Sequence, residues 1–116
     1  ATGCAAATGP LELAGLARVR EHIAATPTER PEMATLERLA GLDRWSLARQ
    51  FRAAFGTSPS RFRTLRQLDA VRRLLRRGSS LADAADAAGF ADQSHMSRQF
   101  KQAYGLTPAR WSAALG

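Results

Sequence analysis

The sequence predicts an all-α protein in which two helix-turn-helix subdomains are joined by a long linker helix. Three observations support this fold class: a repeat between residues 41–62 and 89–111, matching caps and glycines in both copies, and apolar residues at helical spacing. The 116 residues are 45% hydrophobic. That is enough apolar material for a core, and it excludes a disordered or collagen-like chain.

The repeat is the strongest signal. Residues 41–62 read GLDRWSLARQFRAAFGTSPSRF, and residues 89–111 read GFADQSHMSRQFKQAYGLTPARW. After one inserted residue, Ala91, the copies align at a constant offset of 49. An aspartate, the triplet Arg-Gln-Phe, a glycine, a proline and an aromatic residue then coincide. We therefore expect both copies to form the same local structure.

Two helices are predicted to open the first subdomain. The first, over about residues 12–25, carries an apolar face that closes the core. This face consists of Leu13, Leu16, Val19 and Ile23. The second helix is MATLERLA (33–40), which ends at Gly41, where a left-handed backbone lets the chain turn.

A third helix begins after Asp43, a good N-cap, and ends at Gly56. At about 100° per residue, its apolar and polar side chains separate into two faces. The predicted core face holds Leu47, Phe51 and Phe55, and the outward face holds Trp45, Arg49 and Arg52. A tryptophan among exposed arginines leaves a large apolar surface in water, which is unfavourable unless a partner covers it, so this face is a candidate binding surface.

Residues 59–77, PSRFRTLRQLDAVRRLLRR, are predicted to form the linker helix. Ser58 and Pro59 supply a cap and a first-position proline, and Gly78 ends the helix. Its apolar residues at helical spacing are Phe62, Leu65, Leu68, Val71, Leu74 and Leu75. At ~1.5 Å per residue it spans roughly 28 Å, close to the ~34 Å between major-groove segments on one face of DNA.

The second subdomain repeats the first. LADAADAA (81–88) ends at Gly89, Asp92 caps the next helix, and Gly105 ends that helix before Thr107-Pro108 starts another. The same helical wheel buries Met96, Phe100 and Tyr104 and turns Ser94, Arg98 and Lys101 outward.

Positive charge is concentrated in one segment. The chain carries a net +7, yet residues 44–77 alone hold ten arginines and a single acid, Asp69. A solvated face is the ordinary explanation of a charge run, but the near absence of acids favours a polyanionic partner.

Several functional classes are disfavoured. The sequence has no acid pair, no Ser/His/Asp set and no glycine loop for phosphates, so we expect neither an enzyme nor a cofactor or metal site. It has no apolar run of membrane-span length, so we expect no membrane partner. The single cysteine, Cys4, cannot form an internal disulfide, which favours a reducing compartment, the cytoplasm.

The stretch AAGFADQSHMSRQFKQAYGLTPARW (87–111) resembles the second helix-turn-helix signature of the AraC/XylS family of bacterial transcriptional regulators. The first copy and the linker resemble their counterparts less specifically, and the likeness runs from about residue 11 to 114. The resemblance implies seven helices, with two recognition helices in adjacent major-groove segments of a promoter, and activation or repression of transcription. Met96 stands where relatives usually carry Phe or Leu, a tolerable apolar exchange.

The resemblance also implies partners and boundaries. We expect double-stranded promoter DNA and RNA polymerase as partners, with an N-terminal effector-binding or dimerisation domain outside this chain. The predicted domains are a tail over 1–10, a first subdomain over 11–58, the linker helix over 59–77 and a second subdomain over 78–116. The start without Met favours an excised domain.

Base reading is predicted for the outward residues near the start of each recognition helix. Arg49 and Arg98 occupy equivalent positions from which an arginine can bind guanine O6 and N7, with a phosphate contact or an internal salt bridge as the alternative. The other candidates are Trp45, Ser46, Gln93, Ser94, His95 and Ser97. Trp45 would contact a thymine methyl or sugar, or else be a partly buried ring, and His95 has local packing beside the turn as its alternative.

Phosphate contacts are predicted for five further cations and for the starts of two helices. The alternative for the cations is that their charge is simply solvated. These residues are Arg44, Arg52, Ser58, Arg63, Lys101, Thr107 and Arg110. The alternative function is a basic helical module that binds RNA or an acidic protein partner. That function explains the positive charge but not the presence of two matching helix-turn-helix subdomains. In addition, the deep, narrow major groove of RNA would not admit their recognition helices.

Overall fold

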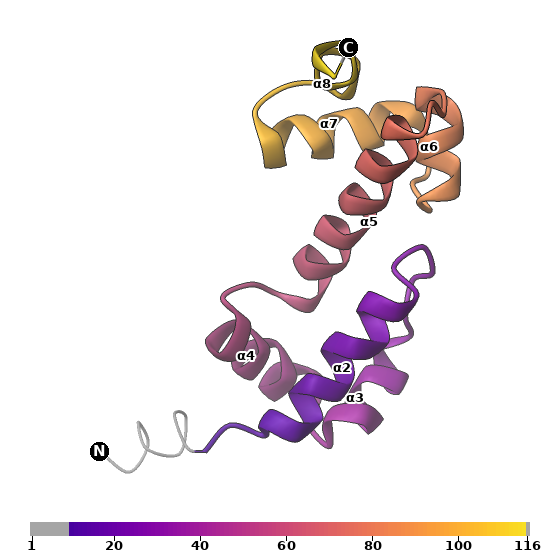
Figure 1. Cartoon of the computed structure of the whole chain (residues 1–116). Coiled ribbons are helices and arrows are strands. Elements are labelled where there is room, and N and C mark those ends of the chain that lie inside the picture. Colours follow the sequence, from indigo (N-terminus) through magenta and orange to yellow (C-terminus); the bar gives the residue numbers. More distant parts are fainter. Residues whose placement is uncertain (1–9, 116) are drawn as a thin grey trace. The chain divides into compact units, whose positions relative to one another are not determined.

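The computed structural model describes residues 10–115 (Figure 1), which form seven α-helices and no strand. The helices are α2 (Leu13–Ala25), α3 (Met33–Ala40), α4 (Arg44–Phe55), α5 (Pro59–Arg76), α6 (Leu81–Ala87), α7 (Gln93–Tyr104) and α8 (Pro108–Ala114). The predicted all-α fold and its helix order are confirmed. The predicted tail over residues 1–10 falls outside the described residues except for Pro10, and Cys4 lies outside them.

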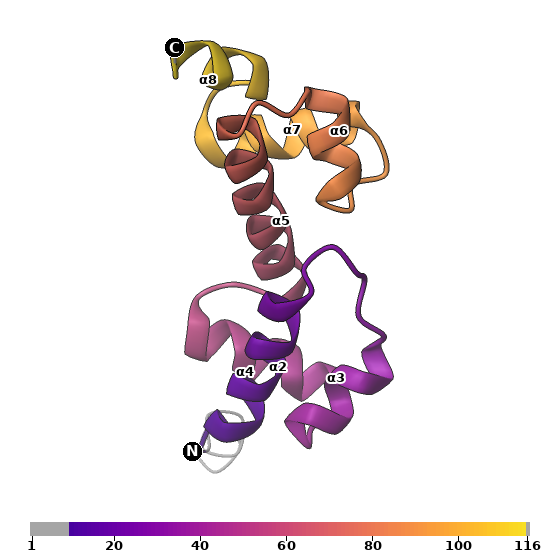
Figure 2. The same cartoon turned by 45° about the vertical axis from the view of Figure 1, so that its right-hand side comes forward.

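The described chain divides into two units. Unit 1 comprises residues 10–25 and 31–59 and contains α2, α3 and α4. Unit 2 comprises residues 26–30 and 60–115. It contains α6, α7, α8 and all of α5 except its first residue. Within unit 1, α2 contacts both α3 and α4, and within unit 2, α7 contacts both α6 and α8 (Figures 1 and 2). None of the helices in residues 10–115 combines the length and apolar character needed to cross a membrane.

The predicted caps at Asp43 and Asp92 and the predicted glycine turns of the two copies are confirmed. Asp43 accepts a hydrogen bond from the Ser46 N–H (2.9 Å), and Asp92 accepts one from the His95 N–H (2.7 Å). Gly41 and Gly89 both have positive φ, 69° and 86°, in the turns before these caps. Each unit therefore contains a helix, a glycine turn and a capped second helix.

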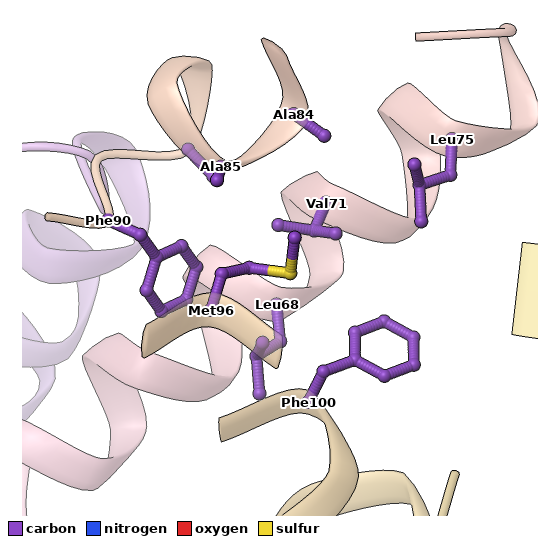
Figure 3. Close-up of a cluster of buried hydrophobic side chains, with 9 residues drawn as sticks. Leu68, Val71, Leu75, Ala84, Ala85, Phe90, Met96 and Phe100 are labelled. Atoms are coloured by element: carbon purple, nitrogen blue, oxygen red, sulfur yellow. The ribbon is translucent and has the colours of Figure 1, made fainter. Parts of the chain in front are cut away.

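The cores of the two units use equivalent positions. Phe51 and Phe100 are fully buried, and each meets the ring four residues later, Phe55 or Tyr104, edge to face at 4.7 Å. Figure 3 shows the unit 2 core, where Met96 of α7 lies among apolar side chains of α5 and the Phe90 ring. The residues labelled there are Leu68, Val71, Leu75, Ala84, Ala85, Phe90, Met96 and Phe100.

One core prediction is wrong. Leu13 is 60% exposed, although Leu16, Val19 and Ile23 of the same helix are buried. Leu13 is the first residue of α2. A side chain on the outer turn of a helix has few neighbours to cover it, so it stays in solvent while the following turns pack.

The buried positions of α2 and α5 also follow the same spacing, which extends the repeat upstream of the aligned segments. In α2 they are Gly15, Leu16, Val19 and Ile23, and in α5 they are Gln67, Leu68, Val71 and Leu75. The two units are thus built from the same three-helix arrangement, α2–α3–α4 and α5–α6–α7.

Candidate nucleic-acid interface

The exposed side of α4, which we call the α4 face, combines cations with an exposed aromatic ring. Trp45 is 73% exposed, the largest exposure of any large hydrophobic residue in the described chain. Arg44, Ala48, Arg49 and Arg52 are exposed on the same helix, whereas Leu47 and Phe51 are buried behind them. The predicted separation is confirmed for the outward residues and for Leu47 and Phe51, while Phe55, also predicted in the core, is half-buried.

A hydrogen-bonded chain links Arg49 to the start of α4. The Ser46 hydroxyl donates to Asp43 Oδ2 (3.3 Å), and Arg49 Nη2 donates to the same hydroxyl oxygen (3.4 Å). The bond from the Ser46 backbone N–H is the main cause that holds the pKa of the Asp43 carboxyl below its ordinary value of 3.8, and the Arg49 charge lowers that pKa further. Ser46 is half-buried whereas Arg49 is exposed. The hydroxyl therefore binds the guanidinium from the side of the helix that faces the core.

The exposed side of α7, which we call the α7 face, also carries cations, but no such hydrogen-bonded chain of described residues reaches its arginine. Gln93, Ser94, Arg98 and Lys101 are exposed, and Ser97 is half-buried beside them. Arg98 makes no hydrogen bond or ion pair with any residue in the described part of the chain, including Asp92, the partner that an internal salt bridge would require. Its guanidinium is therefore available to an external acceptor.

His95 lies apart from the exposed residues of α7. Its ring packs edge to face on Phe90 with 5.6 Å between centroids, and its Nδ1 is buried with no hydrogen-bond partner. Base reading by His95 stays a prediction, while these contacts match its alternative, local packing beside the turn.

The predicted phosphate residues differ in how they are engaged. Arg52, Lys101 and Arg110 are exposed. The backbone N–H of Arg44 donates to Glu37 Oε2 (2.9 Å). The Thr107 hydroxyl is the N-cap of α8 and accepts from the backbone N–H of Arg110 (3.2 Å).

Arg63 and Ser58 are less accessible. Arg63 is half-buried, and its Nε donates to the Glu29 carbonyl oxygen (3.1 Å). Burial, together with the charge of Arg30, lowers the pKa of Arg63. Ser58 is half-buried next to the start of α5.

Several arginines of α5 are held by contacts within unit 2. Arg66 and Arg72 both pair with Asp69. Arg72 also lies over the Tyr104 ring (4.6 Å), and Arg76 lies over the Trp111 ring (5.5 Å). Part of the charge run is thus structural, and the exposed cations of α4 and α7 are the better candidates for a polyanion.

Two glutamines that accept hydrogen bonds from residues far away in the sequence were missed in the sequence analysis. Gln50 Oε1 accepts from the Glu12 N–H (2.8 Å) just before α2, and Gln99 Oε1 accepts from Arg61 Nη1 (3.4 Å) near the start of α5. Both are the central residue of the repeated Arg-Gln-Phe triplet. The sequence did carry a signal, because glutamine occurs at this position in both copies of the repeat. The flanking arginines were predicted to contact DNA and the flanking phenylalanines to lie in the core, but no role was predicted for the glutamines.

Two capped helix-turn-helix units, each with an exposed arginine on its second helix, define the class of helical DNA-binding domains. Residues 36–114, more than half of the chain, match the family described as "Helix-turn-helix domain". The chain belongs to this family, in its AraC-type form, and is a sequence-specific DNA-binding transcription regulator.

Solved structures of this type share the fold. The DNA-binding domain of the global transcriptional factor AdpA, in complex with a target DNA, is 26% identical with a TM-score of 0.76, over 85% of this chain and 90% of that one. An AraC-type regulator from Chromobacterium violaceum is 25% identical with a TM-score of 0.76, over 85% and 89% of the two chains. A probable AraC family regulator from Rhodopseudomonas palustris is 22% identical with a TM-score of 0.78, over 86% and 95%. No curated protein matched the sequence.

Proposed function

We propose that the protein reads promoter DNA with α4 and α7, each placed in the major groove of a duplex segment. The observation that carries this proposal is the equivalent placement of Arg49 and Arg98, both exposed one turn into a capped helix. An arginine there can donate two hydrogen bonds to guanine O6 and N7, the commonest specific contact in the major groove.

The neighbouring residues complete each reading face. On the α4 face, Trp45 offers an apolar surface for a thymine methyl or a sugar, and Ala48 adds a small apolar side chain. Ser46 acts mainly through Arg49, to which it is hydrogen-bonded. On the α7 face, Gln93, Ser94 and Ser97 supply hydrogen-bonding groups near the helix start, where a recognition helix meets base edges.

Phosphate contacts fix the register of both helices without reading sequence. We assign them to the exposed Arg52, Lys101 and Arg110, to Arg44, and to the helix starts at Ser58 and Thr107. Arg63 contributes only where a phosphate reaches its half-buried guanidinium.

The proposal also covers the organisation of the chain and its partners. It keeps a first subdomain over residues 11–58, a linker helix over 59–77 and a second subdomain over 78–116. It places the protein in the cytoplasm as a binding protein without catalytic activity. RNA polymerase and an effector-binding or dimerisation domain are its further partners.

The test is a selection from a random-sequence duplex library. The domain is incubated with the library at about 150 mM salt, where non-specific phosphate binding is already weak, and the retained DNA is sequenced. We expect two preferred blocks about one helical turn apart. The Arg49→Ala variant should lose one block and Arg98→Ala the other. A single block would remove one helix from the proposal, and no enrichment would contradict base reading by both.

The competing RNA-binding function is tested by comparing affinities for a duplex DNA and a duplex RNA of equal length. Each affinity is measured over a range of salt concentrations, which also gives the slope of log affinity against log salt. The proposal requires tighter binding to DNA, because the narrow major groove of RNA does not admit a helix. Equal or tighter binding to RNA would favour the basic-module alternative.

A further inference from the structure

Unit 2 contains an open pocket of about 500 Å³ that is lined by cations and hydrogen-bond donors. All of its lining residues belong to unit 2. Arg30 comes from the loop after α2, Arg63 and Thr64 come from α5, and His95 and Gln99 come from α7. Neither aspartate nor glutamate lines it.

The two arginines of the pocket lie near each other without an acid in the lining to balance them. Burial lowers the pKa of Arg63, and the positive charge of Arg30 lowers it further. Arg30 has no hydrogen-bond or ion-pair partner among the described residues. By contrast, two other arginines of this unit, Arg66 and Arg72, share the Asp69 carboxylate. An anion in the pocket would relieve this like-charge repulsion.

The loop that carries Arg30 is held in place on two sides. The Glu29 carbonyl oxygen accepts from Arg63 Nε (3.1 Å). At Gly89 the backbone of Thr28 approaches so closely that a β-carbon on the glycine would collide with its carbonyl oxygen. These contacts hold the backbone of the loop just before Arg30, which reduces the backbone entropy lost on binding.

The α7 side of the pocket supplies donors. His95 Nδ1 is buried and has no hydrogen-bond partner among the described residues, so the other ring nitrogen, Nε2, is the atom of this side chain that we expect to bind a ligand. The Gln99 Oε1 already accepts from Arg61, which leaves its amide N–H groups as the part of that side chain that can bind a further ligand. A group rich in acceptors and carrying negative charge fits this set.

We propose that this pocket binds an oxyanion, specifically a phosphate group, through Arg30, Arg63, His95 and Gln99. Phosphate offers several acceptor oxygens and a charge that the two guanidinium groups match. The group has two possible sources, a free phosphate or phosphorylated small molecule, and a backbone phosphate of bound DNA.

The first experiment is a titration of the protein with inorganic phosphate in the absence of DNA, followed by NMR signals of the arginine Nε–H groups and the histidine rings. We expect saturable shifts at Arg63 Nε and His95 Nε2. The Arg30→Gln variant should bind about tenfold more weakly, the usual effect of removing a charged hydrogen-bond partner. The matched control, Arg77→Gln, removes an exposed arginine of unit 2 outside the pocket and should bind like the unchanged protein.

Two results would overturn the proposal. One is a shift that grows linearly at all arginines, which indicates ionic screening alone. The other is equal phosphate affinity in Arg30→Gln and Arg77→Gln. Because no DNA is present, either failure leaves the proposed reading of promoter DNA untouched. Likewise, failure of the duplex selection leaves the phosphate titration valid.

A second titration identifies the source of the phosphate. The protein is saturated with a duplex at low salt before inorganic phosphate is added. If a DNA phosphate occupies the pocket, Arg63 and His95 no longer respond, and Arg30→Gln weakens DNA binding more than Arg77→Gln does. If the ligand is a free phosphate, both residues still respond in the complex and the two variants bind DNA equally. Either outcome supports a phosphate site and assigns its source.

Discussion

In unit 1 the exposed arginine Arg49 is hydrogen-bonded to Ser46, whereas its counterpart in unit 2, Arg98, has no partner among the described residues. The difference originates two positions after the first residue of α4 and of α7. Unit 1 has Ser46 there, a short hydroxyl side chain that reaches both Asp43 and Arg49. Unit 2 has His95, whose ring packs on Phe90. Arg49 is therefore tethered within its own unit, whereas no contact with a described residue holds Arg98.

The interior of the two units differs in a corresponding way. In unit 1, Gly15 of α2 lies so close to Ala40 that an added β-carbon would collide with the Ala40 carbonyl oxygen. In unit 2 the equivalent residue, Gln67, is buried and donates to the Ala88 carbonyl oxygen (3.1 Å). The same junction is thus closed by direct backbone contact in one unit and by a side-chain hydrogen bond in the other. The repeat preserves the apolar core and leaves polar contacts to vary.

Truncation of the matching core phenylalanines should have the largest effect. We expect Phe51→Ala and Phe100→Ala each to lower the free energy of unfolding by about 3–5 kcal/mol, because each removes a fully buried ring. Hydrogen exchange at the amides of Leu47 and Met96 measures the loss in each unit. Trp111, which meets Phe100 edge to face at 5.8 Å, gives a fluorescence signal for unit 2. If either variant lowered protection equally in both units, the units would unfold as one.

Gly15→Ala tests the close contact in unit 1. In an open helix this change would stabilise by about 1 kcal/mol, but here we expect a net loss of about 1–3 kcal/mol because α2 and α3 must separate. Thermal or urea unfolding measures the change. Ala17→Gly, at an exposed position of the same helix, gives the propensity effect alone. A stabilised Gly15→Ala protein would contradict the close approach of the two helices.

Much of this comparison was predictable from the sequence, because local signals determine it. The caps Asp43 and Asp92 and the turn glycines depend on a few neighbouring residues, and the buried rings follow from helical spacing. The long-range polar contacts had no such signal. The bond from Gln67 to Ala88 joins residues 21 positions apart, and the role of Arg63 depends on a loop that packs against α5 from far upstream in the sequence. Site residues were predicted as a set of outward positions, and only the structure distinguishes the tethered Arg49 from the unpartnered Arg98.

Arg49→Ala and Arg98→Ala compare the two reading faces directly. Each should weaken binding to the preferred duplex by about 1–3 kcal/mol and relax the preference at one base pair. Lys101→Ala is the control, since a phosphate contact should weaken all sequences alike and reduce the salt slope by about 0.9. Fluorescence anisotropy with preferred and scrambled duplexes measures both quantities. Equal loss on the two duplexes for the arginine variants would contradict base reading.

Ser46→Ala should have the smallest effect and would sharpen the comparison most. It removes the hydroxyl that holds Arg49 but keeps the guanidinium, so we expect about a twofold loss of affinity for the preferred duplex, the lower end for a single exposed hydrogen bond. If Ser46 acts only by orienting Arg49, the loss should vanish in the Arg49→Ala background. Anisotropy measurements on the four proteins of this double-mutant cycle give the coupling. Additive losses would instead mean that Ser46 contacts the DNA itself, and the two faces would then differ in their readers and not only in how an arginine is held.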